Sequence, residues 1–438
     1  MNRNLKVSNE LLDFIYESPS CFHAVSRISK SLLADGFEEL CEADAWKLMP
    51  GGKYFVRRNQ SSVIAFKVPV GELKGFQIGA AHSDSPTFRI KENMEISVDD
   101  ACTMLNVEKY GGMLCASWFD RPLSVAGRLA VRTDNGIQMK LVNVDRDLLV
   151  IPSLAIHMNR KANDGYSYSI QKDMMPLFGD ESAKGRFMDI VAEAAGVKRE
   201  DILGSDLFLY ARGRGTIWGA DQAYLCAPKI DDLQCAFALL QGFLRGAHPD
   251  TASVYAVFDN EEVGSMTKQG ASSTFLQDVL RRINFSLGGS DADYLRILSS
   301  SFMVSADNAH AVHPNHVSAA DPTNHPHMNR GIVIKFSANQ KYSTDGVSAA
   351  LFRRICECAG VPVQTLQNHS DQPGGSTLGN LSTAQVSLKM VDIGLPQLAM
   401  HSAMETAGTA DTGYLSDAMA VFYNAFIEDF GNGRITIR

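Results

Sequence analysis

Four apolar, β-rich runs that each end in residues able to bind a metal ion constrain this chain most. They are FQIGAAHSD (76–84), SVYAVFDNEE (253–262), FMVSADNAH (302–310) and the pair VSLKMVDIG and QLAMHS (386–402). Nearly continuous apolar strands are typical of a sheet buried on both faces, and helices between them indicate βαβ units. We therefore predict an α/β fold with a mixed, mostly parallel sheet between helices, and function at the carboxyl ends of its strands.

One of the intervening helices is visible in IDDLQCAFALLQGFLRG (230–246). Leucine and phenylalanine recur there at three- to four-residue spacing, which is typical of a helix with one buried face. Asp231 or Asp232 is expected to cap its first turn.

Residues 94–221 have a different pattern. GRLAVRTDNGIQMKLVNVD (127–145) contains two alternating segments around Asn135-Gly136, a sequence that favours a β-hairpin turn. The glycine-rich ARGRGTIWGAD (211–221) then leads back towards the predicted helix. We predict a β-rich unit inserted into an α/β domain that is built from residues 1–93 and 222–438.

Composition excludes several classes of protein. A chain of 438 residues is expected to fold into more than one unit, and its net charge of -8 argues against nucleic-acid binding. The N-terminus lacks the apolar core of a signal peptide, and no later run is long enough for a membrane span. The eight cysteines contain no Cys-x-x-Cys pair. They are interpreted as reduced thiols in a soluble cytoplasmic protein, and not as zinc ligands.

The residues that follow the four runs make a candidate metal site. Taken singly, each has an ordinary explanation, such as a helix cap for Asp231 or a loop position for the others. Together they give two three-ligand sites if Asp231 is shared, with positions open for water and substrate. Nitrogen and oxygen ligands without sulfur suit zinc, cobalt or manganese. The five candidate ligands are His82, Asp231, Glu262, Asp307 and His401.

The adjacent carboxylates of Glu261 and Glu262 suggest two different roles. Adjacent acids are most simply explained as a solvated turn. If they converge with the other acids, however, repulsion requires cations to neutralise them. With Glu262 as a ligand, Glu261 is free to act as general base and to pass a proton from water to a leaving amine. Asp84, two residues after His82, is expected to fix the orientation of that ring or to hold the loop.

Seven motifs in order resemble the M18 family of aminopeptidases, of the aspartyl aminopeptidase type. The matches extend from about residue 17 to the C-terminus: AAHSDSP, SWFDRPLSVAGR, IPSLAIHMNR, KIDDLQ, FDNEEVGS, SADNAHAVHPN and QLAMHSAMET. The resemblance implies a zinc-peptidase α/β domain with two zinc ions, the same five ligands and Glu261 as base. It also implies that residues 94–221 form a dimerisation domain and that dimers assemble into a tetrahedral dodecamer.

The resemblance also implies substrate contacts from His157, His310, Lys335 and Tyr342. His157 is expected to reach the active site of a neighbouring subunit, although the sequence alone favours a histidine packed in the inserted unit. Lys335 lies in GIVIKFS, where a lysine is either at a solvated edge or paired with an anion such as an acidic substrate side chain. The family often has arginine where this chain has Met404, which makes acidic specificity less secure.

The sequence therefore predicts an aminopeptidase that removes N-terminal residues, Asp or Glu first, from peptides. Two alternatives stay open: a dinuclear aminopeptidase or N-acyl amino acid deacylase of neutral specificity, and an assembly scaffold without catalysis. The complete ligand set argues against the scaffold.

Overall fold

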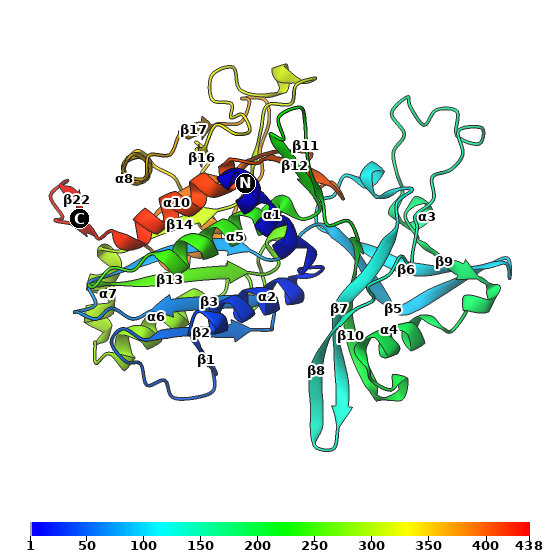
Figure 1. Ribbon diagram of the computed structural model, residues 1–438, viewed down its shortest axis with the longest axis horizontal. Coiled ribbons are helices and arrows are strands. Elements are labelled where there is room, and N and C mark those ends of the chain that lie inside the picture. The colour runs from blue at the N-terminus through cyan, green and yellow to red at the C-terminus, as the bar shows by residue number, and fades with distance from the viewer. Residues whose placement is uncertain (1) are drawn as a thin grey trace.

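A nine-stranded mixed sheet forms the centre of the larger part of the molecule (Figure 1). The computed structural model describes residues 2–438. The strand order is β1-β2-β3-β13-β4-β14-β18-β16-β17, with β13, β4, β14 and β18 parallel to one another. The bounds are β1 Glu38–Leu40, β2 Lys53–Arg58, β3 Ser62–Lys67, β4 Gly75–His82, β13 Thr251–Phe258, β14 Phe302–Ala306, β16 Ile332–Lys335, β17 Val363–Leu366 and β18 Lys389–Gly394.

Both faces of this sheet are buried, which explains the continuous apolar runs. In β13, Tyr255 and Val257 belong to one hydrophobic core, whereas Val254, Ala256 and Phe258 belong to the core on the opposite face. Successive side chains of a strand point to opposite faces, so a strand with two cores needs an apolar residue at every position. The prediction of an α/β fold with a mixed sheet between helices is confirmed.

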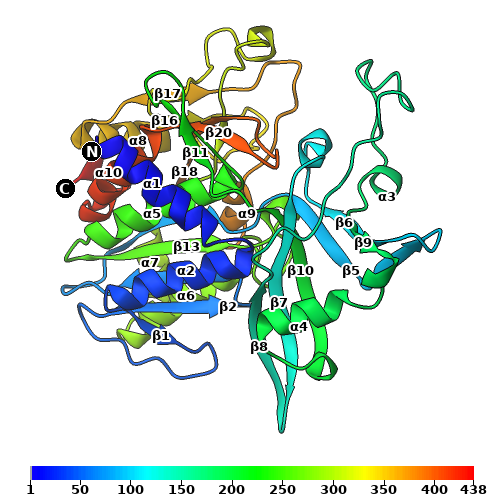
Figure 2. The same ribbon diagram turned by 45° about the vertical axis from the view of Figure 1, so that its right-hand side comes forward.

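Two groups of helices cover the two faces (Figures 1 and 2). The first group packs in the core that contains Tyr255 and consists of α1 Arg3–Tyr16, α2 Cys21–Ala34, α5 Ile230–Arg245, α8 Gly346–Ala359 and α10 Asp411–Asn424. The second packs in the core that contains Val254 and consists of α6 Phe275–Ser286, α7 Asp291–Ser299 and α9 Leu378–Thr383.

Helix α5 begins differently from the prediction. Its N-cap is Lys229, with no side-chain cap bond, and Asp231 and Asp232 have non-helical backbone angles joined by a cis peptide bond. Neither aspartate caps the helix: the Asp232 carboxylate accepts the backbone N–H of His82 at 3.1 Å, and the Asp231 carboxylate lies beside His82 and His401. The irregular first turn leaves the Asp231 carboxylate at the end of the sheet.

A separate six-stranded antiparallel sheet has the order β8-β7-β10-β5-β6-β9. It has its own core, in which Phe187 and Val191 of α4 (Phe187–Ala195) pack against the strands. Residues 134–135, not Asn135-Gly136, form the loop of the predicted hairpin, because Thr133 pairs with Gly136. The remaining bounds are β5 Thr87–Val98, β6 Cys102–Tyr110, β7 Leu123–Thr133, β8 Gly136–Asn143, β9 Leu177–Asp180, β10 Ile202–Ala211, α3 Ile170–Asp173, η1 Cys115–Trp118, η2 Glu181–Ala183 and η3 Arg199–Asp201.

A five-stranded sheet, β11-β12-β20-β19-β15, joins segments from both ends of the chain. Strand β11 belongs here and not to the six-stranded sheet, and the division of the chain at residues 94 and 221 stays a prediction. The bounds are β11 Thr216–Trp218, β12 Tyr224–Ala227, β15 Ala309–His310, β19 Pro396–Leu398 and β20 Glu405–Gly408, with the hairpin β21 Ile427–Asp429 and β22 Ile435–Ile437 and the short helices η4 Glu261–Val263 and η5 Val317–Ala319.

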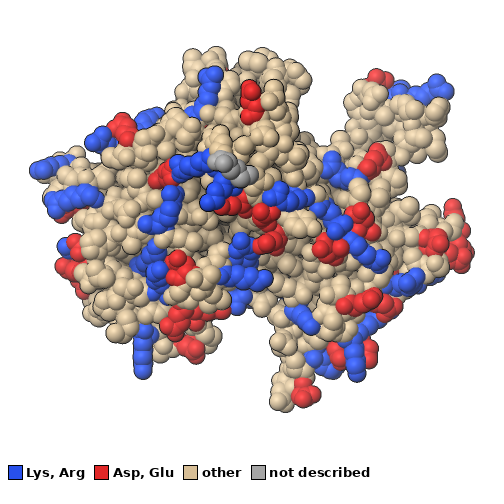
Figure 3. Space-filling model, viewed as in Figure 1, with Lys and Arg blue, Asp and Glu red and all other residues tan. Residues whose placement is uncertain are grey.

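Acidic and basic side chains are interspersed on the face that Figure 3 shows. Over residues 2–438, none of the helices combines the length and the apolar character that crossing a bilayer requires. All eight cysteines are free thiols.

Truncation of Phe243 in α5 is expected to destabilise the larger part of the molecule. Its ring is fully buried and lies 5.4 to 5.7 Å from the rings of Phe37, Tyr255 and Tyr423. Phe243→Ala is expected to lower the free energy of unfolding by about 3–5 kcal/mol in urea denaturation followed by circular dichroism. The matched control is Phe285→Ala, because Phe285 is 46% exposed. Equal effects of the two substitutions would contradict this packing.

Candidate metal centre

The carboxyl ends of four parallel strands bring the predicted ligands to one edge of the sheet. His82 ends β4 and pairs directly with Phe258, the last residue of β13. The chain then continues from β13 to Glu261 and Glu262, and from β14 to Asp307. The segment after β18 and β19 carries His401 in a left-handed backbone conformation, with φ of 67°. Non-glycine residues held in this region are concentrated at functional sites.

The five residues form two groups that could each hold a metal ion. One group consists of His82, Asp231 and Asp307, and the other of Asp231, Glu262 and His401; within each group the ligand atoms lie within 4.8 Å of one another. His82 Nε2 lies 3.4 Å from one Asp231 oxygen, and His401 Nε2 lies 3.5 Å from the other. The Asp231 carboxylate therefore lies between the two groups, one oxygen towards each.

The donor atoms fit divalent cations. Asp231 Oδ1 and Glu262 Oε1 are buried, and neither has a hydrogen-bond partner among the described residues. Burial raises the pKa of Glu262 well above its usual range, and the nearby Asp231 raises it further. A buried anionic oxygen without a donor is costly, and one cation in each group would satisfy these two oxygens.

Neighbouring carboxylates raise the pKa of both candidate histidine ligands, against the effect of burial. Burial acts to lower the pKa of His82, but the carboxylates of Asp231 and Asp84, each 3.4 Å from a ring nitrogen, raise it well above its usual value. Burial likewise acts to raise the pKa of Asp231, yet His401 and His82 hold it below its usual range. Because histidine binds metal in its neutral form, a bound cation would displace these protons and take over their charge.

Asp84 holds the loop that carries both glutamates. Its carboxylate accepts the backbone N–H of Glu261 at 3.1 Å and that of Glu262 at 3.2 Å. It also accepts the hydroxyl of Tyr110 at 2.7 Å, and His82 Nδ1 lies 3.1 Å from its backbone carbonyl. Asp84 is thus a positioning residue for the two glutamates and for His82.

Sequence reasoning did not identify three further positioning groups. Glu405 accepts the backbone N–H of Asp231 at 3.0 Å and that of His401 at 2.7 Å, so it fixes one ligand from each of two distant segments. The Gly112 carbonyl lies 2.5 Å from His401 Nδ1, and Tyr110 contacts Asp84. Glu405 lies within the motif QLAMHSAMET, whereas Gly112 and Tyr110 carry no signal in the sequence.

Glu261 lies beside the ligands but belongs to neither group of three. Burial and the charge of Asp307 raise the pKa of its carboxyl to about 8. Its side chain lines a cavity of about 300 Å³ together with four of the five candidate ligands. A carboxylate at this position can exchange a proton with a molecule in the cavity.

The same cavity is lined by three of the four predicted substrate contacts, His310, Lys335 and Tyr342. Lys335 is 3% exposed; its Nζ donates to the Asn308 carbonyl at 2.7 Å and lies 3.5 Å from the Asp307 carboxylate. Lys335 is therefore paired with anionic and polar groups, as predicted for a buried lysine, and does not lie at a solvated edge. Gly375, Ser376 and Thr377, which precede α9, also line the cavity.

His157 lies elsewhere. It is exposed in the segment between β8 and α3, which projects from the six-stranded unit (Figure 1), and it does not line the cavity of its own chain as far as residues 2–438 show. The sequence alone favours a histidine packed inside residues 94–221. That interpretation is wrong, because the His157 side chain is exposed. Its contact with a neighbouring subunit stays a prediction.

Comparison with known proteins identifies the family. The family described as aminopeptidase I zinc metalloprotease (M18) matches residues 14–426. A protein of Clostridium acetobutylicum named "Probable M18 family aminopeptidase 2" is 45% identical and covers 97% of this chain and 100% of its own length.

Two solved structures are similar over nearly the whole chain. The structure of the Ape4 and Nbr1 complex has a TM-score of 0.92 at 33% identity, covering 96% of this chain and 86% of the other. The S. cerevisiae mApe1 dodecamer has a TM-score of 0.85 at 27% identity, covering 97% of each chain. The chain therefore belongs to the M18 family of zinc metalloprotease aminopeptidases.

Proposed function

We propose that this aminopeptidase uses two divalent metal ions to remove N-terminal residues, aspartate and glutamate first, from peptides. The observation that carries the proposal is the pair of ligand groups that share Asp231 and border one cavity. His82, Asp231 and Asp307 would hold one ion, and Asp231, Glu262 and His401 the other. Zinc fits the family description and the ligand types, as do cobalt and manganese.

Bound divalent ions supply Lewis acidity, which lowers the pKa of a water molecule and polarises a peptide carbonyl. Glu261, which is not a ligand, accepts the proton of the attacking water and delivers it to the amine that leaves. Asp84 fixes the backbone of Glu261, and Tyr110 holds Asp84. Because the loop is fixed at its peptide groups, the base keeps its place while its carboxylate moves the proton.

Specificity for acidic residues rests on Lys335. It is the buried cation of the cavity, with its ammonium 5.4 Å from the ring centre of Tyr342. Asp307 neutralises part of its charge at 3.5 Å. When Asp307 binds a cation, more of the lysine charge is available to a substrate carboxylate. Neutral specificity and deacylase activity are the alternatives, and a panel of aminoacyl and acyl substrates separates them.

Self-association is the second part of the proposal. The projecting segment that carries His157 exposes Leu154, Ile156 and Met158 by 52%, 50% and 75%. Clusters of exposed apolar side chains are typical of interfaces. A relative at 27% identity is described as a dodecamer. We infer dimers through residues 94–221, assembly into a tetrahedral dodecamer in the cytoplasm, and His157 reaching a neighbour's cavity.

Replacement of Glu261 is expected to separate catalysis from metal binding. Glu261→Gln should lower kcat by about a hundredfold to ten-thousandfold, because the amide cannot accept the proton. Its zinc content should equal that of the parent protein, as measured by elemental analysis. Glu108→Gln, at an exposed position, is the control and should retain full activity. Full activity of metal-loaded Glu261→Gln would remove the proposed base and support the scaffold alternative.

Replacement of Asp231 tests whether two ions share one ligand. Asp231→Asn should lose both ions, because the amide supplies a weak and neutral ligand to each group, whereas Glu262→Gln should lose one. The readout is bound zinc per chain after gel filtration. Asp411→Asn is the matched control: Asp411 is also buried, but it accepts the backbone N–H groups of Asn329 and Gly331. Retention of one full equivalent by Asp231→Asn would contradict a shared ligand.

Replacement of Lys335 tests acidic specificity. Lys335→Met should lower kcat/KM for an aspartyl substrate by about tenfold to a hundredfold relative to the asparaginyl analogue, through loss of a charged hydrogen bond. The ratio between the two substrates cancels any general effect through Asp307. Lys341→Met, an exposed lysine nearby in the chain, should leave the ratio unchanged. An equal loss for both substrates would mean that Lys335 acts only through its ion pair with Asp307 and does not recognise the substrate side chain.

A further inference from the structure

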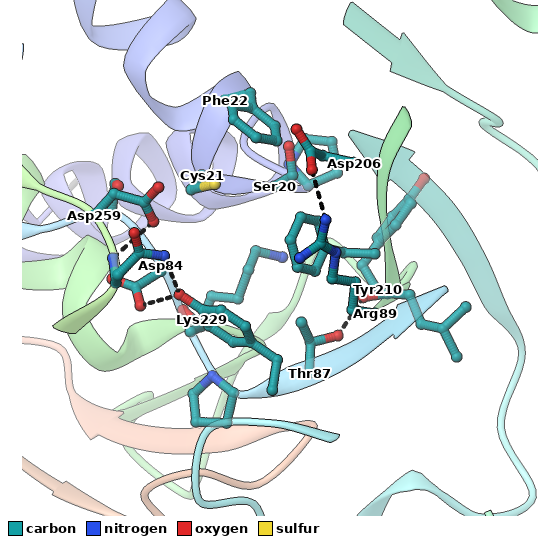
Figure 4. Close-up of a pocket in the computed structure, with 18 of the residues that line it drawn as sticks. Ser20, Cys21, Phe22, Asp84, Thr87, Arg89, Asp206, Tyr210, Lys229 and Asp259 are labelled. Atoms are coloured by element: carbon teal, nitrogen blue, oxygen red, sulfur yellow. Dashed lines mark hydrogen bonds and ion pairs between the residues drawn. The ribbon is translucent and has the colours of Figure 1, made fainter. Parts of the chain in front are cut away.

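A second cavity, larger than the one at the metal centre, lies between the two main parts of the fold. It has a volume of about 390 Å³ and is found at the junction of α2, the start of α5 and strands β5 and β10 of the six-stranded sheet (Figure 4). Cavities of this size typically hold small molecules. We call it the junction cavity.

The carboxylates that line the junction cavity already have partners. Asp206 binds Arg89 at 2.8 Å and Arg128 at 2.9 Å. Asp259 accepts the backbone N–H of Asn260 at 2.8 Å. Asp84 and Glu405 accept the backbone N–H groups of metal-site residues. Two arginines therefore neutralise Asp206, whereas backbone N–H groups hold the other three carboxylates in place.

Lys229 also lines the junction cavity, and unlike Arg89 and Arg128 it is not paired with a carboxylate. Its side chain reaches towards the middle of the junction cavity in Figure 4. Lys229 is half-buried, its Nζ lies 5.8 Å from the ring centre of Tyr210, and its side chain makes no hydrogen bond or ion pair with the described residues 2–438. Lysine offers three N–H donors, so an anion in the cavity would find an unused hydrogen-bonding group.

The first turn of α2 also lies at this cavity. Its N-cap Ser20 makes no side-chain cap bond, because its hydroxyl is bonded to His23 Nδ1 at 2.8 Å. Backbone N–H groups at the start of a helix favour a negative group. Lys229 and the start of α2 therefore add two independent attractions for an anion.

Aromatic rings form one part of the cavity wall. Five aromatic side chains line the cavity: Phe22, Tyr110, Trp118, Phe208 and Tyr210. Phe208 lies edge-on to Tyr110, with the ring centres 5.6 Å apart. Such a wall favours an apolar or aromatic body with a single charged group.

We propose that the junction cavity binds a small carboxylate with an aromatic or branched apolar body, its carboxylate on Lys229 and its body against the aromatic wall. The site is separate from the substrate cavity, since Lys229 does not line the latter and Lys335 does not line the former. Asp84 and Glu405 border the junction cavity while fixing residues of the metal centre. A ligand there would contact two of the groups that position the metal ligands.

Isothermal titration calorimetry of the zinc-loaded protein with 3-phenylpropionate tests the proposal. The acid should bind saturably, and 3-phenylpropanamide, which has the same shape without charge, should bind about tenfold more weakly or worse. This comparison needs no variant. Because it does not depend on peptide hydrolysis, its failure would leave the proposed function untouched.

Two lysine variants locate the bound carboxylate. Lys229→Met should weaken binding of the acid by about tenfold or more, whereas Lys229→Arg should retain it. Lys268→Met, at an exposed lysine on the rim of the same cavity, should have little effect. An acid held by the metal ions instead would bind equally to Lys229→Met. That result, or no saturation below about 10 mM in the parent protein, would overturn the proposal.

Discussion

Repulsion between buried carboxylates at one edge of the sheet is the constraint on which the rest of this structure depends. Asp231, Glu261, Glu262 and Asp307 all line one cavity. The two-sided sheet makes the problem harder, because it removes the water that would otherwise screen these charges. Histidines and a lysine beside the acids offset part of this repulsion. Asp84 and Glu405 add further carboxylates, which hold peptide N–H groups of the site.

Division of labour between adjacent glutamates follows from this arrangement. Both residues lie in the short helix η4, and Asp84 fixes the peptide N–H of each. Glu262 lies 3.3 Å from His401 Nε2 and belongs to a ligand group, while Glu261 faces the cavity without belonging to one. Side chains one residue apart can thus share a rigid backbone and still serve different partners.

The sequence was sufficient to predict the sheet and to place candidate ligands at the ends of its strands, but not to show that all five converge. A strand with two cores is apolar throughout, and parallel strands end at the same edge, so His82, Glu262 and Asp307 could be named as candidates from the pattern. The sequence was insufficient wherever a partner comes from a distant element. The Asp232 carboxylate meets the N–H of His82 and therefore does not cap α5, and Tyr110 reaches Asp84 from the six-stranded sheet. Local propensity describes neither contact, because both depend on how separate segments pack.

The order of the ligands along the chain has a consequence for how the protein is made. His82 emerges early during translation, whereas His401 follows only after β18 and β19 have been synthesised. Strand β4 pairs with β13 and β14, which both come much later, so the central strands cannot complete their pairing until most of the chain is available. Contacts of this range form late and slowly. A nascent chain that has not yet reached His401 is consequently without its complete set of candidate metal ligands.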